Sequence, residues 1–255
     1  MRTNDSEYGG FWKAARQKTR WIDPFTYSDL LLKKINPEDQ WFIRFPVELV
    51  TALLSAFVLY SIIGFVLQTA MPLVIVVSGS MEPALHRGDV VVLQGVGNSL
   101  KAQPVVVPFE LADRAFAGFG STSYFLNAQN RPELFAVKIA DQNIRFDKTG
   151  DIVVYFSRFN GEPIIHRAVL LIRAKDGDFV LTKGDSVHNL TFDEDCGIVI
   201  AGVPQKPCIT PFPVPVAQLQ GKAVGWIPWI GYIKLILVDD SRELLAGCPN
   251  GCRFP

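Results

Sequence analysis

The chain has 255 residues, enough to bury the core of one large domain or two small ones. Its 25 basic and 25 acidic side chains give a formal net charge of zero. This balance excludes a disordered, highly charged chain and gives no support to nucleic-acid binding. A mean hydropathy of +0.21 is high for a purely soluble protein. The composition therefore predicts a soluble domain with an apolar segment attached.

The apolar segment lies in the first third of the chain, where no charged residue occurs between Leu49 and Leu67. About 20 helical residues span the roughly 30 Å core of a bilayer, so residues 46–70 are long enough to cross a membrane as one helix. A buried core helix is the alternative. A cleavable signal peptide is excluded by position, because 45 mostly polar residues come first. We expect Pro46 in the first helical turn and Pro72 just beyond the last.

Basic residues flank this segment unequally. Lysine and arginine are frequent before it, whereas the first basic residue after it is Arg87. The positive-inside rule therefore predicts that residues 1–45 are cytoplasmic and residues 71–255 extracytoplasmic. The cysteines would then lie in an oxidising compartment, which favours disulfides, with free thiols or a zinc site as alternatives and the pairing left open. They are Cys196, Cys208, Cys248 and Cys252.

Short strands dominate the remainder. Apolar, β-branched runs bounded by Gly, Asp or Asn predict a mainly β domain. Residues 97–147 differ in character, with many Phe and a Gly/Ser/Thr cluster, and predict an inserted small subdomain of short strands. Residues 221–238 are apolar but interrupted by Pro228 and Gly231, so they predict strand–turn–strand rather than a second membrane helix. The other expected strands lie at 73–77, 90–96, 151–155, 164–172 and 179–182.

Three histidines are the candidates for acid–base chemistry. His86 and His188 lie in polar turns, whereas His166 lies inside an apolar strand. An imidazole there is a general-base candidate, since its ordinary pKa of about 6.5 suits proton transfer near neutral pH. A hydrogen-bonded core histidine is the alternative. Ser80 follows Gly79 in a tight turn and is a candidate nucleophile, against the alternative of an ordinary Ser-Gly turn.

Carboxylates follow His166 in the chain, at Asp185, Asp193 and Asp195. A nucleophile, a base and an orienting acid in the order Ser, His, Asp are chemically sufficient for acyl transfer. Lys183 precedes this acidic loop, and we expect it to be a solvated surface lysine.

Four motifs follow the apolar segment in a fixed order. They are Ser-Gly-Ser-Met-Glu-Pro at 78–83, Arg-Gly-Asp before a strand at 87–89, Ile-Ile-His-Arg at 164–167 and Thr-Lys-Gly-Asp at 182–185. Together they resemble type I signal peptidases. The resemblance is to the archaeal and endoplasmic-reticulum branch, which has His where the bacterial and mitochondrial enzymes have a general-base Lys. The regions that match are 46–95, 149–195 and 221–238.

The resemblance implies a mainly β, signal-peptidase-like antiparallel catalytic domain, with residues 97–147 inserted, anchored by one N-terminal transmembrane helix. It implies Ser80 as the nucleophile and His166 as the general base. Ser78 is implied as an oxyanion-binding side chain beside the backbone N–H of Ser80.

The acid of the triad is where this chain departs from the family pattern. The usual Gly-Asp-Asn-Asn is replaced by Gly-Asp-Ser-Val at 184–187. Asp185 matches the Asp of the Lys-Gly-Asp motif. Asp193 is the first candidate for the triad acid, and Asp195 is the second.

The implied activity is that of a serine endopeptidase that removes N-terminal signal peptides from secreted and membrane preproteins. The expected partners are these preproteins and the lipid bilayer, with the translocon as a further candidate. The expected location is the cell membrane, or the endoplasmic-reticulum membrane in a eukaryote. No metal, organic cofactor or nucleic acid is expected. Two alternatives stay open, an inactive membrane-anchored adaptor of the same fold and a processing peptidase for a narrower class of precursors.

Overall fold

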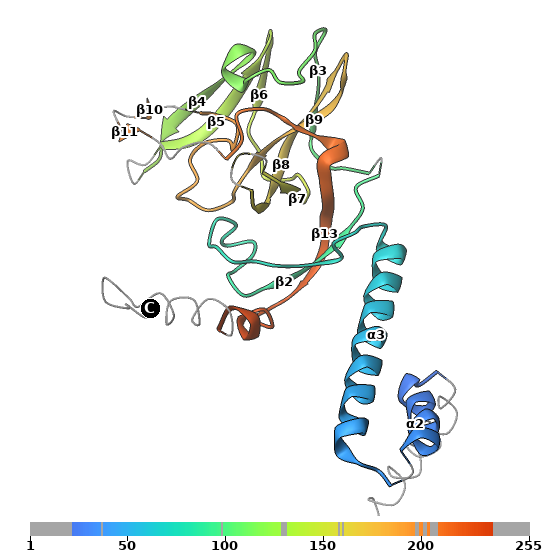
Figure 1. The fold of residues 1–255 in the computed structure, drawn as a ribbon. Coiled ribbons are helices and arrows are strands. Elements are labelled where there is room, and N and C mark those ends of the chain that lie inside the picture. The colour runs from blue at the N-terminus through green and yellow to red at the C-terminus, as the bar shows by residue number, and fades with distance from the viewer. Residues whose placement is uncertain are drawn as a thin grey trace, which may run out of the picture. The chain divides into compact units, whose positions relative to one another are not determined.

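The computed structural model describes residues 22–236 except 37, 98, 129–131, 158, 160, 197–198, 201–202 and 205–208. The chain divides into two compact units, Met1–Val66 and Leu67–Pro255. In Figure 1 the helices of the first unit are blue and the strands of the second run from green to red. Each unit is described by itself.

The first unit contains helix α2 (Pro24–Ile35) and most of helix α3 (Trp41–Leu67). The side chain of Asp23 caps α2 by accepting a hydrogen bond of 3.0 Å from the N–H of Phe25, and a proline begins the helix, as is common at this position. Gln40 precedes α3, and its carbonyl accepts hydrogen bonds from the N–H groups of Ile43 and Arg44 in the first turn of that helix.

Helix α3 contains the expected apolar segment. It has 27 residues, a mean hydropathy of 2.3 in its most apolar window and no residue buried within the structure, so it is long and apolar enough to cross a membrane. The helix begins at Trp41 and ends at Leu67, whereas the expected membrane segment was 46–70, and the crossing of a membrane stays a prediction. Pro46 therefore lies inside the helix rather than in its first turn, and an ion pair of 2.6 Å between Arg44 and Glu48 spans the proline.

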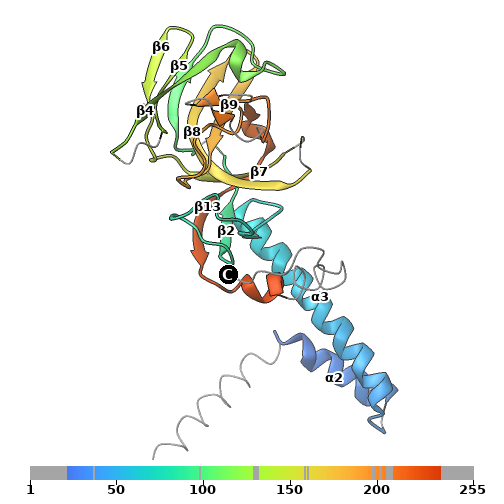
Figure 2. The ribbon, with the colours of Figure 1, turned by 90° about the vertical axis from the view of Figure 1, so that its left-hand side faces the viewer.

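The second unit is built on a mainly antiparallel sheet with the strand order β1-β2-β13-β7-β8-β9-β12. Figures 1 and 2 label its strands β2, β13, β7, β8 and β9 in two views. A further strand, β3, pairs parallel with β8. The expected fold class, a mainly antiparallel β domain, is confirmed. The strands are β1 (Leu73–Ile75), β2 (Val90–Gln94), β3 (Gln103–Val106), β7 (Ile152–Phe156), β8 (Pro163–Ala174), β9 (Gly177–Lys183), β12 (Val214–Pro215) and β13 (Leu219–Ile227).

A smaller antiparallel sheet lies within the predicted insertion. It contains β4 (Gly120–Leu126), β5 (Pro132–Ile139) and β6 (Gln142–Arg145). A two-stranded pair, β10 (Val199–Ile200) with β11 (Val203–Pro204), completes the described strands. Buried side chains of β5, including Val137 and Ile139, form one hydrophobic cluster with Leu170 and Ile172 of β8. The insertion thus shares a core with the strand that contains His166.

The end of the described chain differs from the expected strand–turn–strand. Strand β13 ends before Pro228, and residues 232–236 are helical. The N–H groups of Lys234 and Leu235 both bond to the carbonyl of Gly231, three and four residues back, which is helical pairing. The expected second strand was therefore wrong.

Two Gly-Asp pairs connect distant segments to this sheet. Asp89 is buried, and its carboxylate accepts hydrogen bonds from the N–H of His86 (2.9 Å) and of Trp229 (3.3 Å). Asp151 accepts a hydrogen bond of 2.9 Å from the N–H of Lys101 and pairs with Lys222 at 3.3 Å. In both cases a short acidic side chain provides hydrogen-bond acceptors for backbone that the sheet itself does not pair.

Gly150, which precedes Asp151, packs closely against the backbone of β8. A Cβ there would lie 1.8 Å from the carbonyl oxygen of Ala168 on β8. We predict that Gly150→Ala lowers the free energy of unfolding by about 2–3 kcal/mol, because β8 must move to relieve the clash. Gly225→Ala is the control, since a Cβ there meets nothing within 4 Å. Thermal unfolding of the detergent-solubilised chain tests both, and equal melting temperatures for the two variants would contradict the prediction.

Candidate active site

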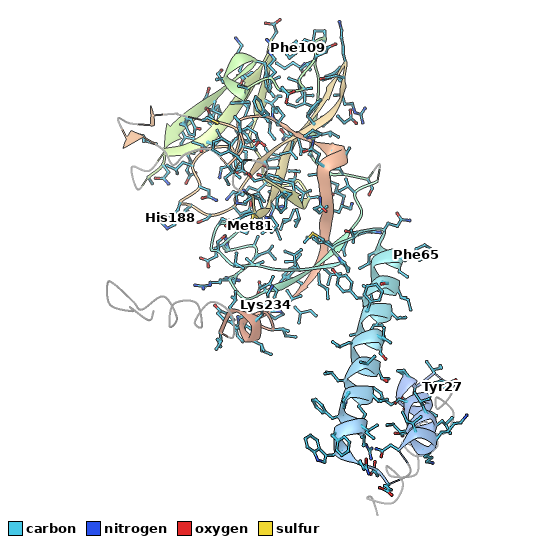
Figure 3. All side chains as sticks on the ribbon, viewed as in Figure 1. Tyr27, Phe65, Met81, Phe109, His188 and Lys234 are labelled. Atoms are coloured by element: carbon cyan, nitrogen blue, oxygen red, sulfur yellow. The ribbon has the colours of Figure 1, made fainter. Side chains whose placement is uncertain are left out.

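The loop that contains Ser80 is fixed on both sides. Before it, the N–H of Val76 donates to Asp89 O (2.9 Å). After it, the side chains of Met81 and Leu85 are almost fully buried in the core, and Figure 3 labels Met81 there. An apolar anchor directly after the serine holds the turn in place and leaves the half-buried Ser80 at its tip.

Ser80, His166 and Asp193 form a continuous hydrogen-bonded chain. Ser80 Oγ lies 3.0 Å from His166 Nε2, and His166 Nδ1 lies 2.6 Å from Asp193 Oδ2. His166 is 2% exposed and Asp193 is 5% exposed. Since a carboxylate only accepts, Nδ1 is the protonated nitrogen of the neutral ring, and Nε2 is free to accept the Ser80 proton. This is the arrangement of a nucleophile, a general base and an orienting acid.

The other two candidate carboxylates bind elsewhere. Asp185 forms a two-pronged ion pair with Arg167, with Nε–Oδ1 at 2.8 Å and a terminal guanidinium nitrogen 2.5 Å from Oδ2. Asp195 accepts a hydrogen bond of 2.8 Å from Thr122 on β4. Burial raises the pKa of Asp195. Of the three, the structure brings only Asp193 to His166.

The remaining polar candidates are Ser78, His86 and His188, and of these Ser78 lies beside Ser80. Ser78 is exposed, with its Oγ 3.2 Å from that of Ser80. His86 and His188 are both exposed, and His188 lies at the outer edge of the β domain in Figure 3.

Residues 184–189 support the main chain of Ser80. The N–H of Ser186 donates to Ser80 O (3.0 Å), and Asn189 Nδ2 donates to the same oxygen (3.2 Å). Gly184 makes this approach possible, because a Cβ there would lie 2.6 Å from Ser80 O and 3.0 Å from His166 Nε2. No motif in the sequence indicated these contacts.

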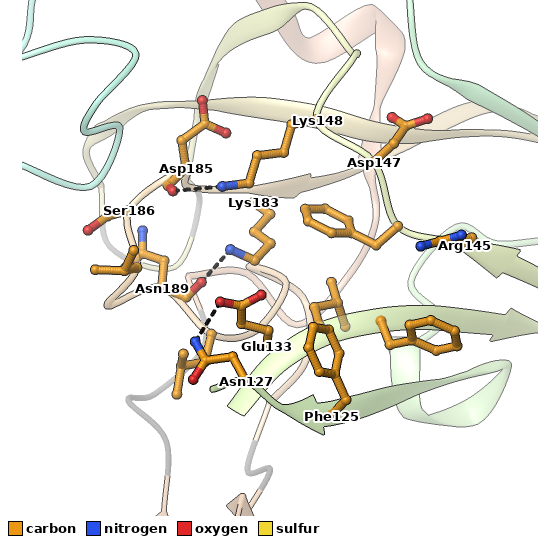
Figure 4. Close-up of a pocket in the computed structure, with 15 residues that line it drawn as sticks. Phe125, Asn127, Glu133, Arg145, Asp147, Lys148, Lys183, Asp185, Ser186 and Asn189 are labelled. Atoms are coloured by element: carbon orange, nitrogen blue, oxygen red, sulfur yellow. Dashed lines mark hydrogen bonds between the residues drawn. The ribbon is translucent and has the colours of Figure 1, made fainter. Parts of the chain in front are cut away.

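Lys183 stabilises the same loop through hydrogen bonds to two of its carbonyls. The expectation of a solvated surface lysine was wrong, since Lys183 is only 6% exposed. Its ammonium donates to Gly184 O (2.9 Å) and to Asn189 O. Burial, together with the charge of Lys148, lowers its pKa to about 8. Figure 4 shows Lys183 and Lys148 in the wall of a hollow of about 600 Å³ that the loop shares with β5 and β6.

Three further buried polar residues surround Asp193. Tyr155 OH donates to Asp193 Oδ2 (3.0 Å), and Thr182 Oγ1 lies 2.6 Å from the same oxygen. The N–H of Thr182 donates to both carboxyl oxygens of Glu194, each at 3.2 Å. Burial, and then the neighbouring Asp193, raise the pKa of Glu194 well above its ordinary value. Thr182 opens the Thr-Lys-Gly-Asp motif and Tyr155 ends an expected strand, but neither was a candidate site residue, because strand residues of these types are usually structural.

Of the four cysteines, Cys196 alone lies in the described part of the chain. Cys196 is disulfide-bonded. Cys208, Cys248 and Cys252 lie outside the described residues, so the pairing stays a prediction. Over the part of the chain that is described, no group of three or more His, Cys, Asp or Glu side chains could hold a metal ion.

The lowered pKa of Lys183 predicts how the stability of the chain depends on pH. Between about pH 8 and its ordinary value of 10.5, the unfolded chain binds this proton and the folded chain does not. The free energy of unfolding should therefore rise with pH in this window, by up to about 1.4 kcal/mol per pH unit from this residue. Melting temperatures at pH 7.5 and 9.5 should show a more positive slope for the unmodified chain than for Lys183→Met. Lys138→Met, at an exposed position, should keep the original slope. Equal slopes for the unmodified chain and Lys183→Met would contradict the prediction.

Known proteins resemble this chain over about three quarters of its length. No protein-family model matches the chain. It is 27% identical over 195 residues to the signal peptidase complex catalytic subunit SEC11 of Eremothecium gossypii, covering 76% of this chain and 82% of the relative. It is 26% identical over 199 residues to the subunit of the same name from Schizosaccharomyces pombe, covering 76% and 81%. The relative from Scheffersomyces stipitis is 26% identical over 189 residues, covering 73% and 77%. The expected resemblance is thus confirmed: the homologues of this chain include catalytic subunits of signal peptidase complexes, the endoplasmic-reticulum branch of type I signal peptidases.

Proposed function

We propose that the chain is a membrane-anchored serine endopeptidase that removes signal peptides from secretory preproteins, with Ser80 as nucleophile, His166 as general base and Asp193 as orienting acid. The observation that carries the proposal is the hydrogen-bonded chain from Ser80 Oγ through His166 to Asp193. Its support from homology is that the catalytic subunits of signal peptidase complexes resemble this chain over about three quarters of its length.

The chemistry follows from the protonation pattern of the histidine. His166 Nε2 takes the proton of Ser80 as its Oγ attacks the scissile carbonyl, and the carboxylate of Asp193 stabilises the imidazolium that forms. The imidazolium then donates its Nε2 proton to the leaving amine. Water hydrolyses the acyl-enzyme by the same steps in reverse order, with His166 again as the base.

The oxyanion would be held by a side-chain donor of Ser78 and a backbone donor of Ser80. The Ser78 hydroxyl lies beside Ser80 Oγ at 3.2 Å, and the backbone N–H of Ser80 provides a second donor. Donors fixed in place before the reaction stabilise the developing charge without reorganisation. An extended substrate would pair along β1, which is the terminal strand in the order of the large sheet and leads directly to this loop.

Anchoring suits a substrate that is itself in the membrane. Helix α3 is long and apolar enough to span a bilayer, and the basic residues before it favour a cytoplasmic N-terminus with the β domain outside. A tether restricts enzyme and substrate to the same surface, which raises their effective concentration. We propose the endoplasmic-reticulum membrane as its location and the translocon as a neighbour.

Removing the nucleophile or the base tests the assignment directly. We predict that Ser80→Ala and His166→Ala each lower kcat for a secretory preprotein by at least about 10³-fold while membrane insertion is unchanged, since neither side chain contributes to α3. Cleavage is measured with full-length chain in lipid vesicles. An unmodified chain that inserts but does not cleave would favour the adaptor. Cleavage of one precursor class alone would favour the narrower peptidase.

The three acidic residues provide a matched series. Asp193→Asn should lower kcat by about 10³- to 10⁴-fold, because an amide at this position favours the wrong histidine tautomer. Asp195→Asn should change kcat by less than about threefold, since Asp195 contacts Thr122 and not the triad. Asp185→Asn should lower the melting temperature, because it weakens the pair with Arg167. A greater kcat loss for Asp185→Asn or Asp195→Asn than for Asp193→Asn would contradict the assignment of the acid.

A further inference from the structure

One carboxylate oxygen accepts every hydrogen bond that links Asp193 to the candidate active site. Asp193 Oδ2 lies 2.6 Å from His166 Nδ1, 2.6 Å from Thr182 Oγ1 and 3.0 Å from Tyr155 OH. Tyr155 and Thr182 are 1% and 0% exposed, so no bulk water competes for these bonds. Because donors approach this oxygen from three side chains, rotation of the carboxylate would break several buried hydrogen bonds at once.

Three adjacent strands and one loop supply these groups. Tyr155 lies on β7, His166 on β8 and Thr182 on β9, which are neighbours in the large sheet. The main chain of Asp193 is fixed to the same strand as Thr182, since its N–H donates to Thr182 O (2.9 Å). The sheet therefore determines both where the acid lies and where its carboxylate points.

Glu194 extends the network by one residue. It is 1% exposed, and Oε1 lies 3.2 Å from Thr182 Oγ1. Burial, and then the neighbouring charge of Asp193, raise its pKa well above the ordinary value, which favours the protonated form with a proton to donate. If that proton goes to Thr182 Oγ1, the hydroxyl must direct its own proton to Asp193. A buried acid that supplies a donor in this way costs less than an ionised one in the same place.

We propose that Tyr155, Thr182 and Glu194 are positioning residues that hold the Asp193 carboxylate as acceptor of the His166 Nδ1 proton. The inference rests on the proposed function, because it concerns the acid of that triad. Among the described residues, the hydrogen bonds of their side chains run to Asp193 and to one another rather than to Ser80. Their loss should therefore reduce kcat and leave KM nearly unchanged.

Thr182 provides the sharpest variant pair. Thr182→Val removes the hydroxyl at nearly constant shape, and we expect a kcat for preprotein cleavage about 10- to 100-fold lower with KM within about twofold. Thr182→Ser keeps the hydroxyl and should retain kcat within about threefold. A full kcat in Thr182→Val, or an equal loss in Thr182→Ser, would overturn the proposal. Tyr155→Phe, expected to lower kcat about 3- to 10-fold, covers the case in which Thr182→Val does not fold.

Glu194 is tested by charge rather than by size. Glu194→Gln is neutral and keeps one acceptor for the Thr182 N–H and one donor for its hydroxyl, so kcat should stay within about threefold. Glu194→Met has neither group and should lose about as much kcat as Thr182→Val. A loss in Glu194→Gln as great as that in Glu194→Met would show that an ionised Glu194 is required, which contradicts the proposed role.

A readout independent of activity separates this inference from the proposed function. In detergent-solubilised full-length chain with Ser80→Ala, ¹⁵N-histidine NMR should show a downfield Nδ1 proton for His166, assigned by its loss in His166→Gln. Thr182→Val should shift or remove this resonance, and Thr182→Ser should preserve it. If the resonance responds this way but the unmodified chain, with Ser80 present, cleaves no preprotein, the proposed function fails and the positioning role stands. If cleavage occurs and Thr182→Val leaves both the resonance and kcat unchanged, the positioning role fails alone.

Discussion

The geometry of the candidate site depends on satisfying one buried carboxylate. Asp193 is 5% exposed, and an ionised carboxylate in such a place is tolerated only when its oxygens accept good hydrogen bonds. His166 provides one of these bonds, and side chains of β7 and β9 provide the others. Pairing β7 with β8 and β8 with β9 brings all the donors together. The strand pairings of the sheet therefore also bring together the side chains that bind Asp193.

Ser80, the proposed nucleophile, is positioned by different forces. Burial of Met81 directly after Ser80 fixes the turn through apolar packing, and two hydrogen bonds from residues 186 and 189 hold the Ser80 carbonyl. Lys183 in turn bonds to two carbonyls of the loop that supplies these donors. The serine thus approaches His166 from a rigid loop rather than from a strand, which leaves its hydroxyl accessible at one side.

Sequence reasoning predicted best where short-range chemistry is decisive. The turn and strand signals around Ser80 and His166 gave their local structure, and the uninterrupted apolar run predicted α3 apart from its ends. The choice among Asp185, Asp193 and Asp195 could not be made from spacing, because it depends on which carboxylate Arg167 and Thr122 engage across the fold. The error at residues 232–236 has a similar origin, since an apolar run of this length suits a strand or a helix and only the bonds to Gly231 decide.

A histidine base imposes a demand that a lysine base does not. Lysine has one nitrogen, so it needs only an environment that keeps the amine neutral. Histidine has two, and the wrong tautomer would direct a proton rather than a lone pair at Ser80. An acid fixed behind the ring removes this ambiguity, but an acid free to rotate would not. The buried contacts of Asp193 with Thr182 and Tyr155 prevent that rotation. The polar network behind His166 therefore meets the demand that a histidine base at this position would impose.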